Sequence, residues 1–226
     1  MYAAAHTAIA LAGKRAVPAA PLFGLMVAAQ ASELVWVALN YLGLEHSAVD
    51  DRGHLHLEYL PYSHSVLVSL GLGAVIWGLV RLVTHRADVA FVFGLVTVSH
   101  IVLDIIQHEP NIRIVPWLAQ PVLGMNLGNS PLLDFAVETA LSVACWAYYR
   151  GSRKLLVVLL LLNVLNLPLM IAGEGFSAPL HNPFILPTVI MATILLAWGL
   201  VWATARRSRP APLMVRPATS ATKTVA

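Results

Sequence analysis

Two pairs of potential metal ligands stand four residues apart inside apolar stretches of the sequence. His100 and Asp104 form the first pair, and Asp134 and Glu138 form the second. Residues four apart lie on one face of an α-helix, so the two residues of each pair could bind one ion together. Imidazole and carboxylate groups together suit zinc or another divalent transition metal. The spacing therefore indicates a divalent metal site, with zinc as the favoured ion.

Three further ionisable residues lie in or beside apolar stretches at comparable depth. Glu33 lies within an earlier stretch, His64 opens the next one in the segment PYSHS, and His108 closes the stretch that holds His100. Ionisable groups inside membrane helices are costly and are functional candidates by default. Serine is a favoured helix-start residue, so Ser-His-Ser can cap a helix and present a ligand at once.

Simpler interpretations remain open for several of these residues. A single His and Asp pair could be a hydrogen-bond clamp between helices. Asp134 follows NSP, as a helix-start residue would. His6 could reach the cluster or lie at a packing seam. His54 and His56, in RGHLHLEY, favour a solvated outer loop or short strand over a metal pair.

The composition identifies the elements that must position these residues. Of the 226 residues 58% are hydrophobic and 11% charged, and the mean hydropathy is +0.75. These values exclude an ordinary soluble domain and predict an all-α, polytopic transmembrane bundle. We expect six spans and a short N-terminal half-helix over 2–13. The spans are expected at about 20–44, 64–84, 89–107, 132–149, 154–173 and 184–205.

The domain organisation follows from the same pattern. Residues 1–205 are predicted to form one bundle with the metal-site motifs within 1–150, and 206–226, rich in Pro, Ala, Ser and Thr, to be a disordered tail. The one cysteine, Cys145, excludes an internal disulfide and a site made of several thiolates.

The distribution of basic residues predicts the orientation. Six crossings with Lys14 and Arg15 inside leave only Arg52 and Arg113 of the 14 Lys and Arg residues outside. The C-terminus is therefore expected in the cytoplasm. In this orientation His, Asp and Glu side chains of four spans are expected to lie in the outer half of the membrane.

The order of these motifs resembles a known family. His6, PYSHS, SHIVLDIIQHEPN, LGNSP and Glu138 together are similar to the membrane-bound, metal-dependent hydrolase-like proteins of bacteria, a group also described as permeases. The similarity covers roughly residues 1–150. It implies a multi-pass protein of the bacterial inner (plasma) membrane.

That group shares a ligand order with the zinc-dependent phospholipase C and single-strand nuclease superfamily. The resemblance implies a first metal site made by Glu33, His64, His100 and Asp104. It implies a second site with His108, Glu138 and Asp134, the last standing where the pattern has His, and a third site within reach of His6. Glu33 departs from the pattern, which has Asp at that position.

These observations lead to a functional hypothesis and two rivals. The hypothesis is a metal-dependent hydrolase that acts on a phosphoester or lipid-linked substrate at the outer half of the membrane, with membrane lipid as a partner and no nucleic acid expected. Asp104 would bridge ions, and Glu33 or Glu109 would be the general base if either is left unligated. The two alternatives are a transporter or channel that uses the same buried cluster, and a scaffold protein whose polar residues only make contacts between helices.

Overall fold

The structure is a computed structural model that describes residues 3–49, 55–59, 61–171 and 184–205. For residues 46–49, 55–59 and 169 only the backbone is described. The tail over 206–226, predicted to be disordered, and His54 lie outside the described residues, and the side chain of His56 does too. The predictions for these parts therefore stay predictions.

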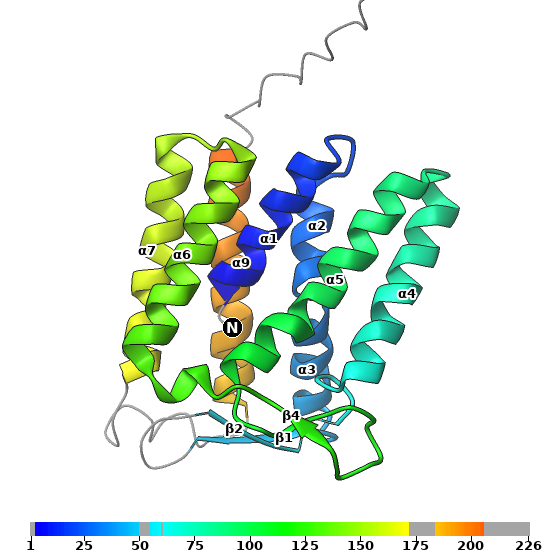
Figure 1. The fold of residues 1–226 in the computed structure, drawn as a ribbon, viewed down its shortest axis with the longest axis vertical. Coiled ribbons are helices and arrows are strands. Elements are labelled where there is room, and N and C mark those ends of the chain that lie inside the picture. The colour runs from blue at the N-terminus through cyan, green and yellow to red at the C-terminus, as the bar shows by residue number, and fades with distance from the viewer. Residues whose placement is uncertain (1–2, 50–54, 60, 172–183, 206–226) are drawn as a thin grey trace, which may run out of the picture.

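The described chain is mostly helical, as the composition predicts. Its α-helices are α1 (Ala3–Ala16), α2 (Leu22–Ala29), α3 (Ala31–Tyr41), α4 (Val66–Thr84), α5 (Ala87–Gln107), α6 (Pro131–Tyr149), α7 (Arg153–Ile171) and α9 (Ile185–Ala205). Two antiparallel pairs, β1 (His46–Val49) with β2 (Leu55–Tyr59) and β3 (Ile112–Arg113) with β4 (Val122–Leu123), lie at one end of the bundle (Figure 1).

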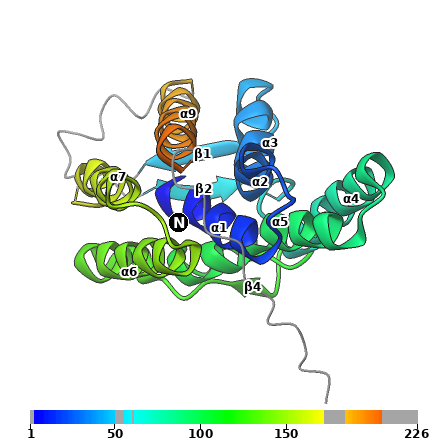
Figure 2. The ribbon, with the colours of Figure 1, turned by 90° about the horizontal axis from the view of Figure 1, so that it is seen from above.

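The short helix α1 lies at the centre of the bundle. It contacts α2, α5, α6, α7 and α9, and Figure 2 shows these helices around it. Small residues such as Ala8 and Ala10 are completely buried on α1, together with Leu11. These side chains belong to an apolar core shared with α2, α5, α7 and α9. The predicted half-helix is thus a buried element rather than a peripheral one.

The helix ends follow local sequence rules. Ser65 caps α4, since its hydroxyl accepts a hydrogen bond from the Val68 amide at 3.3 Å. Pro131 occupies the first turn of α6, where its missing amide hydrogen costs nothing. His85 and Arg150 end α4 and α6 in the left-handed conformation.

The prediction of six spans is not supported. Three described helices, α4, α5 and α9, are long and apolar enough to cross a membrane, and α2 with α3 would make a fourth if the pair counts as one span. Helices α6 and α7 form where spans were expected but are not among the candidates. In α6 the carboxylates of Asp134 and Glu138 lower the mean hydropathy.

The first expected span, 20–44, is broken rather than continuous. Helices α2 and α3 meet at Gln30 with a bend of 54°. Gln30 has φ −107° and ψ 12°, outside the helical values, and its side chain is fully buried. Its Nε2 donates a hydrogen bond to the carbonyl of Ala3, the first residue of α1, at 3.1 Å. A buried side chain from the break thus ties the start of α1 in place.

Close packing of two glycines joins α4 to α5. A Cβ atom added to Gly73 would lie 2.6 Å from Val98 Cγ2, and one added to Gly94 would lie 3.1 Å from the Gly73 carbonyl. By contrast, a Cβ at Gly71 or Gly78 on the same helix would meet nothing within 4 Å. Only the Gly73 face therefore requires the absence of a side chain.

Gly73→Ala should destabilise the protein, and Gly71→Ala should not. The methyl group at Gly73 must push Val98 away, and overpacking of this kind costs about 1–3 kcal/mol. At Gly71 the methyl group meets open space, and alanine favours the helix by up to about 1 kcal/mol. Thermal unfolding of the two variants in detergent would test this. Equal melting temperatures for both would show that α4 is not held through Gly73.

Candidate metal centre

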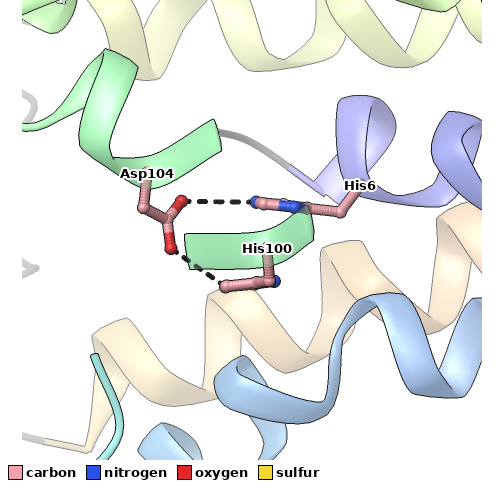
Figure 3. A group of neighbouring side chains, drawn as sticks. All are labelled: His6, His100 and Asp104. Atoms are coloured by element: carbon pink, nitrogen blue, oxygen red, sulfur yellow. Dashed lines mark ion pairs between the residues drawn. The ribbon is translucent and has the colours of Figure 1, made fainter. Parts of the chain in front are cut away.

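Five ionisable side chains from four parts of the chain converge near the hairpin end of the bundle. They are His6 on α1, Glu33 on α3, His64 in the turn before α4, and His100 with Asp104 on α5. We call these five residues the cluster. Figure 3 shows His6 and His100 on the same side of Asp104, each facing one of its two carboxylate oxygens. The cluster members lie up to 98 residues apart in sequence, between positions 6 and 104.

Asp104 lies between three imidazoles. Its Oδ1 is 3.5 Å from His6 Nε2, and its Oδ2 is 3.1 Å from His100 Nε2 and 3.6 Å from His64 Nε2. The Asp104 side chain is 1% exposed. The two oxygens of one buried carboxylate thus face different histidines.

Glu33 completes the cluster on a second side. Its Oε1 lies 3.8 Å from His64 Nε2 and 3.9 Å from His100 Nε2. The Glu33 side chain is 17% exposed, whereas the other four cluster residues are at most 4% exposed. The cluster therefore reaches the surface of the protein at Glu33.

The cluster contains two overlapping groups of three donors. One is His6, His100 and Asp104, and the other is Glu33, His64 and His100; within each group the donor atoms lie within 4.8 Å of one another. Two ligands about 2.0–2.2 Å from a tetrahedral zinc ion are roughly 3.3–3.6 Å apart. Hydrogen-bonded N and O atoms are closer, at about 2.7–3.2 Å. The separations in the cluster, mostly 3.5–3.9 Å, thus fit ligands around an ion better than direct hydrogen bonds.

The ring of His100 is oriented by the break between α2 and α3. Its Nδ1 lies 2.8 Å from the carbonyl oxygen of Ala29, the last residue of α2. A carbonyl can only accept, so Nδ1 carries the proton and Nε2 points toward Asp104 and Glu33. Within the described residues Nε2 is buried and makes no hydrogen bond, which leaves it available to a metal ion.

His64 is oriented by its neighbour in the sequence. Ser63 Oγ lies 2.7 Å from His64 Nδ1, and both side chains are buried. This contact leaves His64 Nε2 directed at Glu33 and Asp104. A second hydrogen bond that fixes the ring is the usual arrangement for histidines that bind metals.

The His6 ring stacks on the His100 ring. Their centroids are 3.9 Å apart and their planes differ by 13°. An imidazole nitrogen binds an ion in the plane of its own ring, so two parallel rings direct their lone pairs to neighbouring rather than identical positions. This geometry supports two adjacent ion positions beside Asp104.

The remaining predicted ligands are not members of these two groups. His108, Asp134 and Glu138 belong to neither three-donor group among the described residues. Asp134 accepts a hydrogen bond from Gln107 Nε2 at 2.9 Å, which suits a structural contact between α5 and α6. Burial lowers the pKa of His108 to about 3, so this imidazole is neutral. The second site with His108, Asp134 and Glu138 therefore stays a prediction, and the structure groups His6 with His100 and Asp104.

Two supporting residues were not foreseen from the sequence. Gln30 fixes the start of α1, and Ala29 supplies the carbonyl that orients His100. An uncharged amide such as Gln30 within an apolar stretch is a weak signal of a buried role. A backbone carbonyl leaves no signal in the sequence at all.

Comparisons with known proteins add no identification. No family model, curated protein or solved structure matches this chain.

The Gln107–Asp134 contact predicts a structural rather than a metal-binding role for Asp134. Gln107→Leu removes the donor to Oδ2 and leaves both oxygens of the buried carboxylate without a hydrogen-bond partner among the described residues, so we expect a loss of about 1–3 kcal/mol in stability without loss of metal. Asp134→Asn retains an oxygen that can accept from Gln107 and should be milder. Thermal unfolding and elemental analysis would measure both effects. Loss of metal from Asp134→Asn would instead make Asp134 a ligand.

Proposed function

We propose that this protein is a membrane-embedded, metal-dependent hydrolase that acts on a phosphoester or lipid-linked substrate at the outer half of the membrane. The observation that carries the proposal is the separation of the donor atoms in the cluster. Three imidazole nitrogens face two carboxylates at 3.1–3.9 Å. Imidazole and carboxylate donors together suit zinc or another divalent transition metal.

The cluster residues divide into distinct roles in this proposal. His64 and His100 would hold one ion with Glu33, and His6 would hold a second beside the first. Asp104 would serve both, because Oδ1 faces His6 while Oδ2 faces the other two imidazoles. Divalent ions held there would lower the pKa of a water molecule and withdraw charge from a phosphoryl oxygen.

Glu33 is the candidate general base in the state in which its carboxylate is not bound to the ion. It is the cluster residue with the greatest exposure, so a water molecule or substrate can reach its carboxylate. Its Oε1 is also farther from the imidazoles than the nearest Asp104 oxygen. A carboxylate held loosely at the edge of the cluster can accept a proton and release it to solvent.

The membrane arrangement belongs to the same proposal. Helices α6 and α7 run alongside α9 in Figure 1, so a bilayer crossed by α9 would enclose them as well. Counting α2 with α3 as one span then restores six crossings. The excess of Lys and Arg at the end opposite the hairpins supports a cytoplasmic C-terminus and a cluster in the outer half.

The purified wild-type protein should contain stoichiometric zinc, and the double variant His100→Ala with Asp104→Ala should contain none. These residues supply donors to both three-donor groups, so their removal dismantles the centre. Elemental analysis of detergent-purified protein measures the metal. Asp88→Ala is a matched control, because Asp88 is an exposed carboxylate on the same helix, paired with Arg86.

Two results would contradict the metal centre. The first is a wild-type protein that holds no zinc and takes up none after treatment with a chelator and dialysis against the metal. The second is a double variant that retains as much zinc as the Asp88→Ala control. In either case the cluster would be a set of contacts between helices.

Hydrolysis itself needs a separate measurement. We expect the protein in lipid–detergent micelles to hydrolyse a chromogenic phosphodiester, to lose this activity to a chelator and to regain it with zinc. Glu33→Gln should lower the rate by about 100-fold or more, since it removes a general base. Wild-type zinc content with no hydrolysis of phosphodiesters or phospholipids would reject the enzyme while retaining the metal site.

Cation or proton transport is the second candidate. It is favoured by a buried polar pair inside the bundle, in which Asn163 Nδ2 donates to Ser142 Oγ at 3.1 Å, one helical turn beyond Glu138. Polar groups at this depth occur in ion and proton routes. Ion flux into proteoliposomes that is lost in Glu138→Gln would favour transport over hydrolysis.

A further inference from the structure

Glu45 is a buried carboxylate that the proposed function does not use. It follows α3, is 1% exposed, and its Oε1 accepts hydrogen bonds from the amides of Tyr62 at 2.8 Å and Ser63 at 2.9 Å. Its Oε2 is buried without a hydrogen-bond partner among the described residues. A charge placed this way is costly unless its contacts are needed to hold a conformation.

The two amides that Glu45 binds belong to the turn that presents His64. Ser63 also contacts His64 directly, since its hydroxyl lies 2.7 Å from Nδ1. On the other side Ser65 caps α4. The backbone before His64 is thus fixed by Glu45 and the backbone after it by the helix cap.

The position of Glu45 in the chain explains why this contact can fix two segments relative to each other. Glu45 immediately precedes β1, and Tyr62 lies three residues after β2 ends. The carboxylate therefore joins the two ends of the β1–β2 hairpin and fixes the turn before α4 relative to the end of α3. Glu33 comes from α3 and His64 from that turn, so the same contact fixes these two donors relative to each other.

We propose that Glu45 is a positioning residue that holds His64 in the cluster and thereby sets the affinity for the ion bound with Glu33 and His100. This inference rests on the proposed metal centre. Glu45 acts through the amide of Ser63 and the Ser63 hydroxyl and does not touch the ion. Loss of such a supporting contact typically lowers metal affinity 10–100-fold.

Cobalt(II) titration of the metal-free protein in detergent tests the proposal, because the visible absorption of cobalt reports its ligands. Glu45→Ala should weaken binding by about 10–100-fold. Glu45→Gln is the matched variant, since its amide oxygen can still accept from both backbone amides. We expect Glu45→Gln to bind cobalt within a few-fold of wild type and to keep the wild-type spectrum.

A double-mutant comparison separates positioning from general destabilisation. In a His64→Ala background the ring that Glu45 holds is gone, so adding Glu45→Ala should leave the remaining cobalt affinity unchanged. A residue that only stabilises the fold would weaken binding equally in both backgrounds. If Glu45→Ala does not fold, Ser63→Ala removes the contact to His64 Nδ1 and should lower affinity in the same, His64-dependent way.

The possible failures are distinguishable. Cobalt binding by wild type that is unaffected by Glu45→Ala, or equally weakened in the His64→Ala background, overturns the role of Glu45 and leaves the metal centre standing. Absence of cobalt binding by the wild-type protein overturns both. Loss of binding in Glu45→Gln as severe as in Glu45→Ala would show that the charge, rather than the hydrogen bonds, is what matters.

Discussion

The hydrogen bond between His100 and the carbonyl of Ala29 couples a break in one helix to the ligand-bearing face of another. A backbone carbonyl released from its helix inside a bundle needs a donor, because no water replaces the lost partner there. His100 Nδ1 supplies it at 2.8 Å. The same bond fixes the ring so that Nε2 faces Asp104 and Glu33. The helix break and the ring orientation therefore stabilise each other. The hydrogen bond from Gln30 to Ala3 also ties the start of α1, the helix that carries His6, to the same break.

The cluster is hard to explain as a set of polar contacts that only hold helices together. Burying three imidazoles and two carboxylates is costly unless each polar atom gains a strong partner. Of the five imidazole–carboxylate separations, that between His100 Nε2 and Asp104 Oδ2, 3.1 Å, lies within hydrogen-bond range, and it is not a formed hydrogen bond. A divalent ion satisfies several donors at once at the longer separations. The same distances that weaken the scaffold interpretation thus support the metal centre.

The sequence was informative about elements and partly about the site. Apolar stretches predicted nearly every helix within a few residues, and helical spacing placed His100 beside Asp104. The break at Gln30 was missed, since no proline or glycine marks it and its causes are contacts with Ala3 and His100. The assignment of Asp134 and Glu138 to a second site also could not be tested by spacing alone. It depended on how α6 is rotated against α5, which the Gln107–Asp134 contact reveals.

The surroundings of the cluster bear on the choice between the proposed hydrolysis and passage of an ion through the bundle. Toward the middle of α5, one turn from His100, Val96 is buried in an apolar core with Leu25 and Met26. An ion leaving the cluster in that direction would meet packed aliphatic side chains and lose its ligands. Toward Glu33 the cluster is partly exposed. A site packed against apolar side chains on one side and partly exposed on the other is compatible with the proposed hydrolase, whose reactant would enter and leave by the same route. A transporter would need a second conformation that opens the packing around Val96, and the polar pair of Ser142 and Asn163 lies on α6 and α7 instead of in that path.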